Sequence, residues 1–157
     1  MKTDFGPPGC SRPNCLPCKS DRPGASHTRS GALYHGTCLI CSQQGITSEY
    51  WGETSRSGYT RTLEHAEDIC SKQDKNAFHK HLTIYHPEKV GDTEAFDIKI
   101  EQTFTKNIDR QVAEAIKIKN SNADILMNSK AEFHQPAIHR VVTTRAPQIR
   151  NRVVGNS

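Results

Sequence analysis

The chain has 157 residues, a net charge of +4 and a sequence pI near 8.8. Apolar residues make up 34% of it and aromatic residues 6%, which suits one domain plus a small appendage, with a thin core that metal or a partner would reinforce. No stretch is apolar enough to cross a bilayer and no apolar run follows the N-terminal lysine, so the composition excludes a membrane-spanning class and we expect no signal peptide. The basic surplus is compatible with a polyanionic partner.

The first thirty residues are rich in proline, glycine, serine and cysteine and show no apolar periodicity. Such a segment cannot bury a core without a cross-link. In the cytosol or nucleus, where thiols stay reduced, cysteines indicate metal rather than disulfides. Residues 1–30 are therefore predicted to be a zinc-binding module, and one candidate ligand set is of the Cys₃His type: Cys10, Cys15, Cys18 and His27.

The middle of the chain predicts alternating strands and helices. Residues 32–52 read as two strands joined by a loop at 42–48. Residues 57–72 read as a helix with one apolar stripe, formed by Leu63, Ala66 and Ile69. Residues 75–86 predict a second, shorter helix, which the following proline ends.

The second half of the domain adds a strand and the best helix. Residues 96–100 alternate apolar and polar side chains, which is a strand signal of period two. Residues 107–120 predict a helix with Asn107 as its N-cap. Its predicted apolar face consists of Ile108, Val112, Ala115 and Ile116. The order strand, strand, helix, helix, strand, helix predicts a small α/β domain, which follows the metal-binding segment at residues 1–30.

The C-terminal segment, residues 134–157, is basic. It carries four arginines and no acidic residue, and its two prolines predict irregular chain. Two interpretations stay open: a solvated tail, or an arm that follows the phosphates of a nucleic acid.

A second group of metal ligands lies inside the domain. Cys38 and Cys41 form a C-x-x-C pair, which can hold one zinc ion with two further ligands. His81 and His86 are candidates and would join the strand hairpin to the second helix. The rival arrangement pairs Cys38 and Cys41 with Cys15 and Cys18 in a Cys₄ ribbon. Cys70 lies near the helix stripe and is expected to be a buried thiol.

Short motifs in the middle of the chain occur in a recognisable order. Ala32-Leu33-Tyr34 precedes the C-x-x-C pair, and Tyr50-Trp51-Gly52 follows it. Arg61, His65, Glu114 and Asn128 come next. This pattern resembles the GIY-YIG nuclease domain, most of all the version fused to the reverse transcriptase of Penelope-like retroelements. The match covers roughly residues 32–130, and we place the domain at 31–133. It departs at Ala32, where glycine is usual, and at Trp51, where isoleucine is usual.

The resemblance implies a fold, a metal content and an activity. The fold is a three-stranded antiparallel sheet flanked by helices. Cys38, Cys41, His81 and His86 would hold one structural zinc, and the N-terminal ligands would hold a second. The activity is metal-dependent hydrolysis of DNA phosphodiester bonds, which would nick target DNA so that the free end primes reverse transcription. The implied partners are DNA, a reverse transcriptase in the same polyprotein and its RNA template, and the implied location is the nucleus.

Hydrolysis of a phosphodiester requires charge neutralisation and an activated water. The resemblance gives Glu114 the role of holding Mg²⁺ or Mn²⁺. Arg61 and His65 are four residues apart on one helix face, where an arginine can hold the scissile phosphate and a histidine a water. Tyr34 or Tyr50 could serve as base instead of His65, and these three candidates stay open.

Other residues have supporting roles. Asn128 is expected to order the site, and the predicted contacts to the DNA backbone are Arg56, Arg140 and Arg145. Two other functions compete with the nuclease. One is a zinc-dependent nucleic-acid-binding module without catalysis, and the other is a zinc-built protein-interaction domain.

Overall fold

The computed structural model describes residues 15, 17 and 27–128. The predicted modules at 1–30 and 134–157 therefore lie almost wholly outside the described residues. The elements in chain order are β1 (Ser30–Cys38), α1 (Leu39–Gln43), β2 (Glu49–Ser57), α2 (Gly58–Cys70), α3 (Ala77–Tyr85), the 3₁₀ turns η2 (Pro87–Lys89) and η3 (Thr93–Ala95), β3 (Phe96–Thr103) and α4 (Asn107–Asn120).

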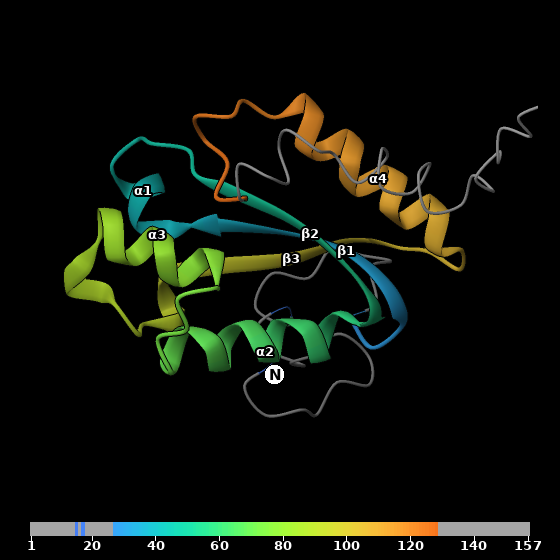
Figure 1. Cartoon of the computed structure of the whole chain (residues 1–157), viewed down its shortest axis with the longest axis horizontal. Helices are drawn as coiled ribbons and strands as arrows, with labels where there is room; N and C mark the ends of the chain where they lie inside the picture. Colours follow the sequence, from blue (N-terminus) through green and yellow to red (C-terminus); the bar gives the residue numbers. More distant parts are fainter. Residues whose placement is uncertain (1–14, 16, 18–26, 129–157) are drawn as a thin grey trace, which may run out of the picture.

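The three strands form one antiparallel sheet in the order β2-β1-β3, with β1 in the centre. Helices α2 and α3 lie on one side of this sheet and α4 lies on the other (Figure 1). The prediction of an α/β fold with a three-stranded antiparallel sheet flanked by helices is confirmed. Among the described residues, no helix combines the length and apolar character needed to span a bilayer.

Alternation along β1 divides the core between the two faces of the sheet. Ala32 and Tyr34 point to the α2 side, where they join the larger cluster with Ile98 and Phe78. Leu33 points to the other side and packs with Trp51 and Ile118 of α4. Because side chains of a strand alternate between faces, this pattern fixes the register of the sheet.

Helix α2 buries a stripe that differs from the predicted one. Its buried residues are Gly58, Thr62, His65 and Ile69, whereas Leu63 and Ala66 are only half-buried. Cys70 is exposed, so its prediction as a buried thiol is wrong. Helix α2 directs the His65 imidazole toward the sheet because the Tyr34 hydroxyl lies there as its hydrogen-bonding partner. A count of apolar residues along the sequence cannot detect such a partner.

Helix α4 shows the same effect. Arg110 and Glu114 are buried on its inner face, while Ile116, predicted to be inward, is 47% exposed. Arg110 forms an ion pair with Glu53 of β2, which allows a buried guanidinium. The predicted cap at Asn107 is also wrong, since the helix begins there and the N-cap is Lys106. The Asn107 side chain instead accepts a hydrogen bond of 3.0 Å from the Arg110 guanidinium.

Gly52 of β2 lies directly opposite Tyr34 of β1. A Cβ atom at position 52 would lie 2.4 Å from both Cζ and the hydroxyl oxygen of Tyr34. The phenol therefore occupies the space above Gly52, and it is held there by the surrounding core.

We predict that Gly52→Ala lowers the free energy of unfolding by about 1–3 kcal/mol, because the buried ring must shift to admit a methyl group. Urea denaturation measures this change. Ser55→Ala, at an exposed position of the same strand, should stay within about 0.5 kcal/mol of the unchanged protein. Equal stability of all three proteins would contradict the tight contact.

Candidate functional site

Four buried side chains form a cluster of metal-ligating groups: Cys38, Cys41, His81 and His86. Their ligand atoms all lie within 4.8 Å of one another. The Cys41 Sγ is 3.4 Å from His81 Nε2 and 3.1 Å from His86 Nε2. Sulfur and nitrogen ligands of a tetrahedral zinc ion are about 3.6 Å apart, so the cluster fits such an ion.

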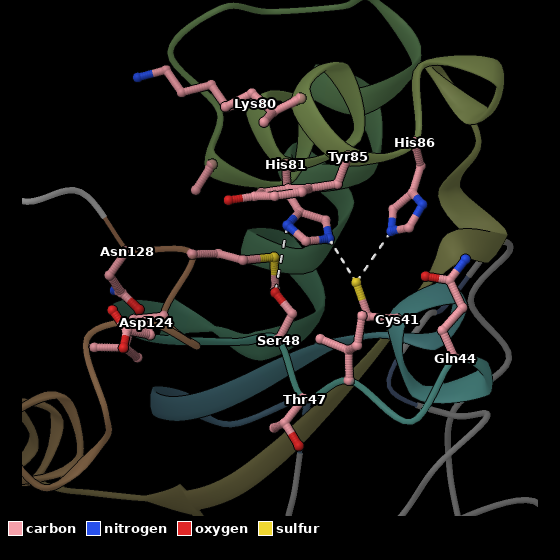
Figure 2. Close-up of a pocket in the computed structure, with 15 residues that line it drawn as sticks. Cys41, Gln44, Thr47, Ser48, Lys80, His81, Tyr85, His86, Asp124 and Asn128 are labelled. Carbon is pink, nitrogen blue, oxygen red and sulfur yellow. Dashed lines mark hydrogen bonds between the residues drawn. The ribbon is translucent and has the colours of Figure 1, made fainter.

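Local structure brings these ligands together. Cys38 ends β1 and caps α1, and its Sγ accepts the backbone N–H of Cys41 at 3.5 Å. The two thiols therefore lie on the same side of one short turn. His81 lies inside α3 and His86 ends that helix. Figure 2 shows both imidazoles directed at the Cys41 sulfur, beside a cavity of about 550 Å³.

The electrostatics of the cluster favour a cation. Burial, followed by the hydrogen bond and charge of Cys38, raises the pKa of Cys41 to about 11. Burial and the neighbouring His86 lower the pKa of His81 to about 4. A divalent cation stabilises thiolates and so offsets the raised pKa of Cys41, while the lowered pKa of His81 already provides the neutral imidazole that a metal needs. His81 Nδ1 lies 3.4 Å from Ser48 Oγ. If Nε2 is the ligand, Nδ1–H donates to this hydroxyl and orients the ring.

This cluster pairs the hairpin cysteines with the two histidines, as the resemblance implied. Cys15, the one N-terminal cysteine of the Cys₄ alternative that the structure describes, is not part of it. Cys15 and His27 are both buried. Cys10 and Cys18 lie outside the described residues, so the second zinc site stays a prediction.

A second group gathers on the α2 side of the sheet. The ring centroids of Tyr34 and Tyr50 are 6.1 Å apart, and His65 lies 5.6 Å from the first and 5.8 Å from the second. The Tyr34 hydroxyl and His65 Nε2 form a hydrogen bond of 2.8 Å. Two phenols from adjacent strands and one imidazole from α2 thus meet at one point.

Arg61 supplies positive charge to this group. It donates to Glu64 at 2.9 Å and also interacts with both phenols. Burial acts to lower the pKa of Arg61, but Tyr34, Glu64 and Tyr50 together hold it above its ordinary value. The guanidinium therefore stays charged at any pH at which the protein is folded, which suits an anion-binding role.

Burial and the Arg61 charge lower the pKa of His65 to about 3, so this imidazole is neutral at physiological pH. The pKa of Tyr34 is raised to about 12, first by burial and against the effect of Arg61. The negative charge of Glu114 adds to this increase. Tyr34 is thus the side chain on which both the guanidinium and the carboxylate act.

A cavity of about 340 Å³ opens beside Tyr50, Arg61 and His65. Three cationic side chains and one carboxylate are among its lining residues: Arg61, Lys75, Lys80 and Asp68. Its volume and its positive balance suit a phosphate group. Lys75 and Lys80 were not singled out in the sequence, because they come from a loop and from α3 and share no spacing with the motifs.

Glu114 reaches the site from the other face of the sheet. Helix α4 packs against Leu33 and Trp51, opposite to the phenols, and Glu114 is not among the residues lining the 340 Å³ cavity. Its carboxylate is nevertheless buried and close enough to raise the pKa of Tyr34. The structure thus brings four of the candidate residues together, whereas Glu114 approaches Tyr34 from the other side of the sheet and does not line the cavity.

Asn128 acts on the backbone of β2. Its amide accepts from Trp51 N–H at 3.0 Å and donates to Trp51 C=O at 2.8 Å. It thereby holds the strand between Tyr50 and Gly52, which agrees with an ordering role. Arg56 donates to Glu64 at 2.8 Å, and the two tail residues predicted to bind DNA, Arg140 and Arg145, lie outside the described residues.

Comparison with known proteins adds no relative. No family model matches the chain, and neither the curated proteins nor the solved structures contain a significant match.

We predict that Cys41→Ser lowers the zinc content of the purified protein by one equivalent and destabilises it by more than about 4 kcal/mol, because losing a metal ligand is among the costliest substitutions. Metal analysis and thermal unfolding measure both effects. Cys70→Ser removes an exposed thiol outside the cluster and serves as the control. Unchanged zinc in Cys41→Ser would exclude the cluster as the metal site.

Proposed function

We propose that this chain is a metal-dependent DNA endonuclease of the GIY-YIG type. A structural zinc would be held by the metal-ligating cluster: Cys38, Cys41, His81 and His86. The observation that carries the proposal is the meeting of two phenols, an imidazole and a guanidinium beside a cationic cavity. These residue types came from separate motifs of the sequence. The strand order, with β1 in the centre and a helix after each of β2 and β3, is consistent with that family.

Arg61 is the group that would bind the scissile phosphate. It lines the cavity and stays charged, so it can neutralise the charge that grows on the phosphoryl oxygens during attack. Lys75 and Lys80 line the same cavity and would attract neighbouring phosphates of the strand. A nucleic acid would enter with its backbone toward α2 and α3.

One of the two phenols would accept the proton of the attacking water. Tyr50 lines the cavity, whereas Tyr34 lies behind it with 1% of its surface exposed. We therefore assign the water-facing role to Tyr50 and a supporting role to Tyr34. A phenolate at either position would be stabilised by Arg61, which interacts with both.

Glu114 is the residue that would hold a catalytic Mg²⁺ or Mn²⁺. It is buried near Tyr34 and would offer a carboxylate oxygen to such a cation. When bound, such a cation supplies Lewis-acid stabilisation of the leaving oxygen. The retroelement context implied by the sequence resemblance adds a role: nicking nuclear target DNA to prime a reverse transcriptase of the same polyprotein on its RNA template.

We predict that the protein nicks supercoiled plasmid with Mg²⁺ or Mn²⁺ and not with EDTA. Glu114→Gln should reduce the nicking rate by at least about 10²-fold, since it keeps the shape but removes the charge that holds the cation. Asp109→Asn, at an exposed carboxylate of the same helix, should nick at the unchanged rate.

Two results would contradict this account in different ways. Equal nicking by Glu114→Gln would remove Glu114 from the mechanism. If the unchanged protein binds DNA in a gel-shift assay but never nicks it, the non-catalytic nucleic-acid-binding module becomes the better description.

A further inference from the structure

We infer that Asn76 is a positioning residue that locks His65 in the Nε2–H form, so that His65 donates to the Tyr34 oxygen and cannot act as the general base. This inference rests on the proposed nuclease function and decides among its three candidate bases. It follows from a chain of hydrogen bonds that runs from Asp68 through Asn76 and His65 to Tyr34.

The first step is the orientation of the Asn76 amide. Asn76 is the N-cap of α3, and its Oδ1 accepts the backbone N–H groups of Phe78 at 3.0 Å and of His79 at 3.2 Å. Backbone N–H groups only donate, so the atom facing them must be the oxygen. The amide nitrogen Nδ2 therefore points away from the helix.

The second step is the protonation of the imidazole. Asn76 Nδ2 lies 3.0 Å from His65 Nδ1 and 3.2 Å from Asp68 Oδ2. An amide nitrogen only donates, so His65 Nδ1 must accept and carries no proton. The proton of the neutral ring is then on Nε2. Asp68 Oδ2 accepts a hydrogen bond from the other N–H of the same amide, which reinforces the orientation of Asn76.

The third step concerns Tyr34. Because Nε2 carries the proton, the 2.8 Å bond to the Tyr34 hydroxyl has the imidazole as donor and the phenol oxygen as acceptor. The hydrogen bond from His65 Nε2–H becomes stronger as the Tyr34 oxygen gains negative charge. His65 thus supports the phenol pair as proton acceptors, and it has no lone pair directed at either the phenol or a water near it.

A purely structural role for Asn76 would need only the oxygen that caps α3. The two roles use different atoms, so they can be separated. Asn76→Ser keeps a good N-cap but has no donor that reaches His65. Asn76→Asp also keeps the cap, but it places an oxygen opposite His65 Nδ1 and favours the Nδ1–H form. Serine serves as the check because an aspartate would also lie near Asp68.

The experiment uses the full chain in its zinc-bound form. Long-range ¹H–¹⁵N NMR of the histidine rings reports which nitrogen of His65 is protonated. We expect Nε2–H in the unchanged protein, Nδ1–H or a doubly protonated ring in Asn76→Asp, and a mixture in Asn76→Ser. Plasmid nicking at saturating DNA should fall by about 10- to 100-fold in both variants, while zinc content, DNA affinity in gel shift and unfolding temperature change little.

An Nδ1–H form in the unchanged protein would overturn the inference, and so would full nicking by both variants. Failure of the proposed function gives a different pattern. Suppose the unchanged protein does not nick DNA but carries the His65 proton on Nε2, and Asn76→Asp moves that proton to Nδ1. The inference that Asn76 fixes the His65 tautomer is then correct, whereas the proposed role of His65 in catalysis is wrong.

Discussion

The buried hydroxyl of Tyr34 is the contact on which the candidate site depends. It lies over Gly52 of the neighbouring strand, where any side chain would displace it, and it is bonded to His65 of α2. It also interacts with Arg61 and with the charge of Glu114 on the other helix layer. A single phenol on the central strand thus connects both helix layers to the sheet, and removing its space or its partners would disturb all of them.

Helix α3 links this site to the metal-ligating cluster. The helix begins after Asn76, which bonds to His65, and it carries His81 and ends at His86. Nine helical residues span about 13 Å, so one short rigid element connects the two groups, with Asn76 at its start and His81 and His86 in its middle and at its end. A metal held by the cysteines of the hairpin would therefore fix not only α3 but also the amide that orients the imidazole.

The sequence predicted the three strands and the three longer helices, because strand alternation and helical periodicity are local signals, but it did not predict the short helix α1. Tyr34, Tyr50, Arg61 and His65 were singled out by the resemblance of the ordered motifs to a nuclease family, and the structure brings them together. The sequence missed the inward faces of α2 and α4, where His65, Arg110 and Glu114 take positions that a hydrophobic count gives to apolar residues. It also missed Asn76, Lys75 and Lys80. These residues contact His65 or line the cavity only because α3 packs against α2, which the sequence does not indicate. The approach of Glu114 from the opposite face is a tertiary feature with no signature along the chain.

The most direct measurement is a crystal structure of the protein bound to a short DNA duplex with Mn²⁺, using anomalous scattering to locate the metals. The account predicts a phosphate in the cavity between Arg61 and Tyr50, a manganese peak at Glu114 and a zinc peak among Cys38, Cys41, His81 and His86. DNA seated on another surface, with no manganese at Glu114 and no phosphate near Arg61, would contradict it.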